Sequence, residues 1–105
     1  MVPDLSVLKL TSAMARHAAQ VHGVVGDNIA RTDLPGANAR AVEGFASALA
    51  RLGEGERALV RDTRTPIALD KQMTQLATNA GRHEVAVTVW SKTLEMMRLA
   101  GGSPR

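Results

Sequence analysis

The sequence contains no cysteine and no tyrosine, and it has one tryptophan and one phenylalanine among its 105 residues. The absence of cysteine excludes a disulfide framework and a thiolate metal site. Aromatic side chains supply much of the buried area of an ordinary core, and a chain of this size buries only about two-thirds of its unfolded surface. Because its apolar residues are mostly Ala, Val and Leu, we expect a helical protein whose stability depends on neighbouring molecules.

Long apolar runs are also missing from the sequence. None approaches the roughly 18 residues of a transmembrane helix, so we expect no direct membrane insertion. The first residues, Met1 to Asp4, do not combine a basic segment with a following apolar one. This pattern predicts that no secretory signal peptide is cleaved.

The formal net charge of +3 comes from scattered basic residues rather than from one patch. One cluster of arginines is interleaved with acidic residues: Arg51, Glu54, Glu56, Arg57, Arg61, Asp62 and Arg64. No aromatic residue accompanies this cluster to stack on bases. We therefore expect no nucleic acid among the partners.

The strongest pattern lies near the C-terminus, where apolar residues recur at alternating steps of four and three. They are Leu69, Met73, Leu76, Ala80, Val87, Trp90, Leu94 and Met97, with His83 in the slot between Ala80 and Val87. A period of 3.5 over about four heptads predicts a coiled-coil-like helix. The helix is expected to begin near Leu69, to end at Gly101-Gly102 and to span roughly 40 Å. A helix of that length needs a partner helix.

A weaker heptad seam lies near the N-terminus. Val7, Met14, Val21 and Asn28 are seven residues apart, and Leu10 (or Thr11), Ala18 and Val25 fill the intermediate slots. The pattern predicts a helix that begins near Asp4 or Ser6 and ends by about Asp33, because Pro35-Gly36 is a strong turn signal. This seam is the expected partner of the C-terminal seam, within the chain or between copies.

The middle of the chain has no comparable period. We expect residues 37–45 to be extended or irregular, a short helix over Phe45–Leu52, and a turn or extended segment at Thr63–Pro66. The predicted fold class is all-α, with two long terminal helices packing as a coiled-coil-like hairpin. Residues 1–33 and 67–101 then form the helical core, and 34–66 form an irregular or extended connecting segment.

No constellation of residues points to catalysis, so we expect no enzyme, no metal and no cofactor. His17 and His22 are five residues apart and do not share a helix face as i,i+4 ligands would. The sequence has no nucleophile elbow, P-loop or dinucleotide-binding fingerprint. Trp90 occupies a seam position, and large aromatic residues anchor interfaces.

Several segments resemble a known family. Asn28 to Gly36 (NIARTDLPG) resembles the motif NIANADTPGYKAR near the N-terminus of flagellar axial proteins, the family of rod and hook subunits. Ala39 to Phe45 looks like the continuation KARDVDF, which is typical of proximal rod proteins. Ile67 to Asn79 is similar to the VDLEKEMAKLAEN of that type, and Trp90-Ser91-Lys92 matches its LSKK region.

The chain also departs from this family at defined positions. Ala37 and His83 stand where the family has tyrosine, which removes two buried aromatic contacts. Ala68 replaces an N-cap aspartate, and an alanine offers no capping side chain. Packing around the turn is therefore expected to differ from that of typical members.

The resemblance implies a structural subunit of the bacterial flagellar basal-body rod, in its proximal part. Its terminal helices would assemble into the axial drive shaft that spans the periplasm. The implied partners are other rod subunits, further copies of the chain, and the MS-ring and export-gate base. Such subunits are exported without a cleaved signal, and their termini become ordered on assembly.

The seams and the motif together give the expected subunit-interface residues. They are Val7, Met14, Val21, Val25, Asn28, Ile29, Pro35, Gly36, Phe45, Leu69, Met73, Leu76, Val87, Trp90, Leu94 and Met97. An alternative is a small helical adaptor or chaperone that binds partner helices and has a stable antiparallel hairpin of its own.

Overall fold

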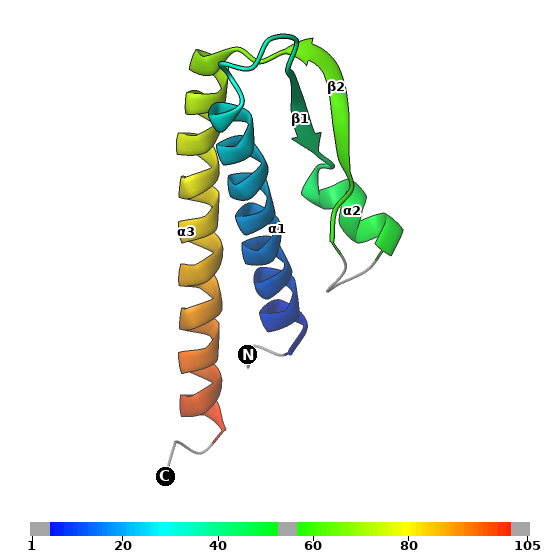
Figure 1. Ribbon diagram of the computed structural model, residues 1–105. Helices are drawn as coiled ribbons and strands as arrows, with labels where there is room; N and C mark the ends of the chain where they lie inside the picture. The colour runs from blue at the N-terminus through cyan, green and yellow to red at the C-terminus, as the bar shows by residue number, and fades with distance from the viewer. Residues whose placement is uncertain (1–4, 53–56, 102–105) are drawn as a thin grey trace.

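The computed structural model describes residues 5–52 and 57–101. Two long helices, α1 (Leu5–Ala30) and α3 (Leu69–Ala100), lie side by side and antiparallel (Figure 1). The other side of α1 carries a pair of strands, β1 (Asn38–Val42) and β2 (Val60–Pro66), and the short helix α2 (Phe45–Leu52). Because α1 is the middle layer, α3 is covered on one side only. The molecule is elongated, 59 Å along its longest axis.

The two long terminal helices are present as the sequence predicts, but the prediction of an all-α chain was wrong, because the segment expected to be irregular or extended contains two paired strands. β1 and β2 pair antiparallel, from Asn38 opposite Pro66 to Val42 opposite Val60. The helix over Phe45–Leu52 is confirmed. α1 begins at Leu5, between the predicted starts at Asp4 and Ser6, and α3 ends at Ala100, directly before the predicted stop at Gly101. Asp4 and Gly102 themselves lie outside the described residues.

The face that α1 turns inward follows the N-terminal seam. Thr11, Ala18, Val25 and Asn28 are buried, whereas Leu10 is exposed, so the threonine occupies the slot that the sequence left open. The Thr11 hydroxyl donates to the carbonyl oxygen of Val7 at 2.9 Å, which satisfies it inside a helix. Small side chains on this face allow close approach of α3.

The expected pairing of the two seams within the chain is met only in part. α3 leaves Leu69, Met73, Val87 and Trp90 of its seam exposed and Leu76, Leu94 and Met97 half-buried. Its buried residues are Gln72, Asn79, Ala86 and Thr93, each one position before an apolar seam residue. One position on a helix is a rotation of about 100°. The Asn79 amide donates to the Ala18 carbonyl oxygen at 2.7 Å, so a polar contact takes the place of an apolar one. Among the described residues, no buried side-chain nitrogen or oxygen lacks a partner.

A tight turn follows α1. The amide of Ala37 donates to the carbonyl oxygen of Leu34 at 3.1 Å, with Pro35 and Gly36 between them. Gly36 has a φ of 74°, so the turn has the residues and the bond of a type II turn. Pro35 presets one position and Gly36 supplies the left-handed one, which makes the connection to β1 rigid.

β2 forms the outer edge of the small sheet, and its residues are mostly exposed. The register shifts between Asn38 and Arg40. Opposite this shift, Arg64 has a φ of 58°, and its amide donates to Asp62 Oδ1 at 2.7 Å. This bulge interrupts the edge in its middle.

Candidate assembly interface

The principal candidate site is a stripe of apolar side chains on the uncovered part of α3. Leu69 (48% exposed), Met73 (52%), Val87 (42%) and Trp90 (38%) lie along it, and half-buried Leu76, Leu94 and Met97 line its inner border. From Leu69 to Met97 the stripe rises about 42 Å. A row of exposed apolar side chains along one face of a helix is a candidate interaction surface.

A second row of apolar side chains lies elsewhere around α3. Val85, Val89, Met96 and Leu99 are exposed, and Leu99 is the most exposed large apolar residue of the described chain. Near these last two residues α3 extends past Leu5, the first described residue of α1 (Figure 1). No described helix therefore covers the end of α3.

The remaining expected interface residues fall into three groups. Val7, Pro35 and Gly36 are exposed, and Met14, Val21, Ile29 and Phe45 are half-buried. Val25 and Asn28 are buried inside the chain. Both are covered within the chain itself, and Asn28 bonds Gln72 of α3 and Arg40 of β1.

Asn28 joins three elements through a network of hydrogen bonds. Its Oδ1 accepts from the Arg40 amide and its Nδ2 donates to the Arg40 carbonyl oxygen, both at 2.9 Å. The same Nδ2 donates to Gln72 Oε1 at 2.9 Å, and Arg31 Nη2 donates to Asn28 Oδ1 at 2.8 Å. Because its amide bonds both backbone groups of one β1 residue, Asn28 replaces a neighbouring strand and fixes α1, β1 and α3 together.

Gln20 lies eight residues before Asn28 on α1 and makes the same kind of contact. Its Nε2 donates to the Ala58 carbonyl oxygen at 2.7 Å, and its Oε1 accepts from the Ala58 amide at 3.0 Å. The segment that leads into β2 is thereby held against α1. Sequence reasoning missed this residue, since a lone glutamine on a helix carries no distinctive signal.

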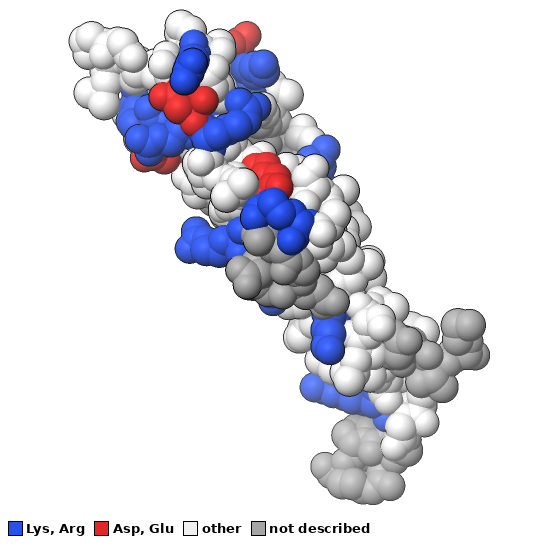
Figure 2. Space-filling model, turned by 90° about the vertical axis from the view of Figure 1, so that its right-hand side faces the viewer, with Lys and Arg blue, Asp and Glu red and all other residues white. Residues whose placement is uncertain are grey.

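Charges on the sheet side of the molecule are mixed in sign (Figure 2). Asp27 pairs with Arg31 at 2.9 Å and with Arg40 at 3.2 Å, and Glu43 pairs with Arg51. The hydrogen bonds from the Arg51 guanidinium and the Leu59 amide lower the pKa of Glu43 from 4.5 to about 2. This face therefore holds internal ion pairs rather than a uniform basic patch.

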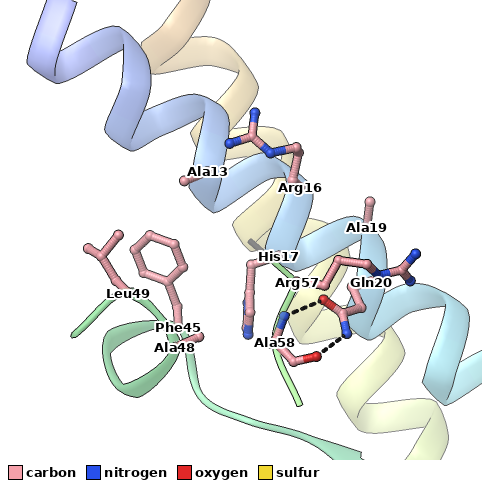
Figure 3. Close-up of a pocket in the computed structure, with 10 residues that line it drawn as sticks. All are labelled: Ala13, Arg16, His17, Ala19, Gln20, Phe45, Ala48, Leu49, Arg57 and Ala58. Carbon is pink, nitrogen blue, oxygen red and sulfur yellow. Dashed lines mark hydrogen bonds between the residues drawn. The ribbon is translucent and has the colours of Figure 1, made fainter. Parts of the chain in front are cut away.

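A cavity of about 360 Å³ lies between α1, α2 and residues 57–58 (Figure 3). The rings of His17 and Phe45 meet there edge to face, 5.6 Å between centroids. The sequence analysis did not find this cavity, because the lining residues lie far apart along the chain and share no motif. They are Ala13, Arg16, His17, Ala19, Gln20, Phe45, Ala48, Leu49, Arg57 and Ala58.

Residues 5–52 and 57–101 include no group of three or more His, Asp or Glu side chains placed to hold a metal ion. Within the same ranges, no helix is both long and apolar enough to span a bilayer. A search of known protein families finds none that matches the sequence, and no curated protein matches it.

Proposed function

We propose that the chain is a structural subunit of the bacterial flagellar basal-body rod, in its proximal part. It assembles through its terminal helices with further copies and other rod subunits on the MS-ring and export-gate base. It reaches the periplasm by export without a cleaved signal, and it carries no catalytic activity. The observation that carries the proposal is the uncovered apolar stripe of α3.

The distribution of buried and exposed residues on α3 supports this proposal. Gln72, Asn79 and Thr93 are buried against α1, while Leu69, Met73 and Val87 are exposed. A helix of an ordinary monomer places its apolar residues in the core and its polar residues in water. The reverse arrangement favours a second helix from another molecule as the natural cover of the stripe.

The size of the stripe indicates how such an assembly is held together. Complete burial of one large apolar side chain contributes about 1.5–3 kcal/mol. Leu69, Met73, Val87 and Trp90 are 38–52% exposed, so covering these four contributes roughly 3–5 kcal/mol per chain. Two facing stripes contribute roughly 6–10 kcal/mol. Association costs about 4–15 kcal/mol in lost translational and rotational freedom. One pairwise contact is therefore weak, and stable association needs several neighbours.

The motif resemblance supports the assignment to the flagellar axial family. Asn28 and Pro35-Gly36, which match the family motif, occupy the hydrogen-bonded junction and the tight turn between α1 and β1. Where the chain departs from the family, Ala68 has no side-chain cap bond at the start of α3. The motif positions thus coincide with a junction that sets how the chain turns.

The test compares Val87→Asp with Thr88→Asp. Both add one charge to exposed positions of α3, but the second lies about 100° around the helix. The native chain is expected to sediment as larger species with rising concentration, and the fluorescence of its single tryptophan to shift to the blue. Val87→Asp is expected to abolish both the larger species and the blue shift, whereas Thr88→Asp is expected to leave both unchanged.

Swimming provides the second readout. In cells that lack the natural chain, Trp90→Ala and Leu94→Asp are expected to abolish motility, because the rod does not assemble. Normal swimming with either variant contradicts the proposal. So does a purified chain that remains a stable monomer at every concentration.

The folded hairpin within one chain favours a second candidate, a helical adaptor or chaperone. An adaptor uses the same stripe for a helix of a different protein. The two functions are separated by the sedimentation experiment, since an adaptor stays monomeric alone and forms a complex only with its partner.

A further inference from the structure

The cavity beside α2 has an apolar wall and a basic rim. Figure 3 shows Phe45 and Leu49 pointing from α2 toward Ala13 of α1, while Arg16 and Arg57 lie away from them. Ala13 is buried and Phe45 and Leu49 are half-buried. A volume of about 360 Å³ lies at the small end of ligand-binding pockets, large enough for an apolar side chain.

Some polar side chains of this cavity already have hydrogen-bond partners within the chain, and others could pair with a ligand. Gln20 uses both amide atoms on Ala58, and His17 Nε2 donates to the Glu43 carbonyl oxygen at 2.7 Å. The lining contains no carboxylate. Arg16 Nη1 donates to Ser12 Oγ at 2.6 Å, but neither Arg16 nor Arg57 forms an ion pair with another described residue. The complementary ligand therefore combines an apolar side chain with an adjacent carboxylate.

The turn after α1 presents this combination. Leu34 is 57% exposed, Asp33 beside it is exposed, and Pro35 and Gly36 hold the turn rigid. Asp33 forms no ion pair within the described residues. On a helix, adjacent residues point in different directions, so the apolar and acidic neighbours on α3, such as Leu69 and Asp70, do not form one protruding group.

We propose that the Asp33–Leu34 turn of one chain inserts into the α1–α2 cavity of a second copy. Leu34 contacts Phe45 and Leu49, and the Asp33 carboxylate pairs with Arg57 or Arg16. This contact rests on the proposed function as a self-assembling subunit and names the surfaces that join its copies.

The two surfaces cannot meet within one chain. Arg16 lies 14 positions before Ala30, the last residue of α1, so about 21 Å of helix separates the cavity from the turn that holds Asp33. A contact between different surfaces of two copies leaves one turn and one cavity free, so it continues from copy to copy unless the rotation closes a ring. It thus joins chains in series, whereas the α3 stripe joins helices laterally.

The absence of cysteine from the sequence allows a clean cross-linking test. The full chain is prepared with Leu34→Cys and Ala19→Cys together, concentrated, and oxidised with copper phenanthroline. Ala19 is an exposed residue of the cavity lining. A ladder of dimers, trimers and longer species is expected, while a mixture of the two single variants gives a heterodimer only.

The matched control pairs Leu34→Cys with Thr78→Cys, an exposed residue on α3. It is expected to give no ladder. An equal ladder from this control overturns the proposed contact, because it shows random collision. Absence of a ladder from the Leu34 and Ala19 pair also overturns it. Sedimentation of the same sample then tells whether the chain associates by another surface or fails to self-assemble at all.

Charge reversal tests the ion pair independently of folding. Arg57→Glu in the cysteine pair is expected to lower the cross-linked fraction about two- to fivefold, the range of a partly exposed ion pair. Adding Asp33→Arg is expected to restore it. Both side chains are exposed, and the far-ultraviolet circular dichroism spectrum checks that each variant keeps its helices. A double reversal that lowers the fraction further contradicts the pairing.

Discussion

Replacement of Asn28 by alanine tests the junction of α1, β1 and α3. Asn28 is 0% exposed and takes part in four hydrogen bonds with Arg31, Arg40 and Gln72. Each bond contributes about 0.5–1.5 kcal/mol, and each buried group left unpaired costs about 1–3 kcal/mol. We expect the free energy of unfolding to fall by about 3–5 kcal/mol, a large part of the 5–15 kcal/mol of an ordinary domain.

The matched control is Asn79→Ala. Asn79 is also buried, but its side chain makes a single hydrogen bond within the described part of the chain, to the carbonyl oxygen of Ala18. Its loss is therefore expected to cost about 1–2 kcal/mol. The assay is urea unfolding followed by circular dichroism at 222 nm. Every variant is measured at one protein concentration, because association stabilises the folded chain.

Equal losses for Asn28→Ala and Asn79→Ala would refute the reasoning. In that case the paired bonds to Arg40 do not hold β1 against α1. Asn28→Asp provides an intermediate variant. It keeps the oxygen that accepts from Arg31 and from the Arg40 amide, but it cannot donate to the Arg40 carbonyl oxygen. Its stability is expected to lie between those of the native chain and Asn28→Ala.

The remaining predictions concern acid stability and two glycines. The pKa of Glu43 is lowered from 4.5 to about 2 in the folded chain. Its pairing with Arg51 therefore stabilises the fold at pH values above 4.5, the pKa in the unfolded chain. This contribution is lost as the pH falls toward 2. Glu43→Gln is therefore expected to flatten the loss of stability between pH 4.5 and 2, measured by urea unfolding across that range; an unchanged slope contradicts the assignment. Gly36→Ala is expected to destabilise the chain by about 1 kcal/mol, since φ is 74°. Gly26→Ala, with open space at an exposed position in α1, is expected to stabilise it by up to about 1 kcal/mol. Thermal unfolding compares the melting temperatures of the two variants. If both shift in the same direction, the left-handed backbone at residue 36 does not require glycine.

The bounds of the helices were predictable from the sequence because local signals mark them. The seam from Leu69 to Met97 and the stop at Gly101 placed α3, and Pro35-Gly36 placed the end of α1. Periodicity shows that a helix has an apolar stripe, but it does not show what covers the stripe. The partner seam of α1 is rich in small residues, and the side chains that bond it, such as Asn79, are polar.

The strands could not be predicted in the same way. Asn38–Val42 has no clear alternation, and Val60–Pro66 is largely polar. Their pairing joins segments about 20 residues apart, and β1 is held by bonds to Asn28 rather than by its own apolar residues. The cavity beside α2 was missed for a related reason, because it exists only once Gln20 holds Ala58 against α1.

The open edge of β2 has a consequence for the proposed assembly of copies in series. An unpaired edge strand is a template for adding the same strand of another copy, the route by which proteins aggregate. Here the left-handed Arg64, the charges of Arg61 and Asp62, and Pro66 interrupt that template, whereas Asn28 already occupies the edge of β1. In the proposed assembly, the contacts between copies are therefore made by side-chain surfaces rather than by the backbone pairing that ends in fibrils.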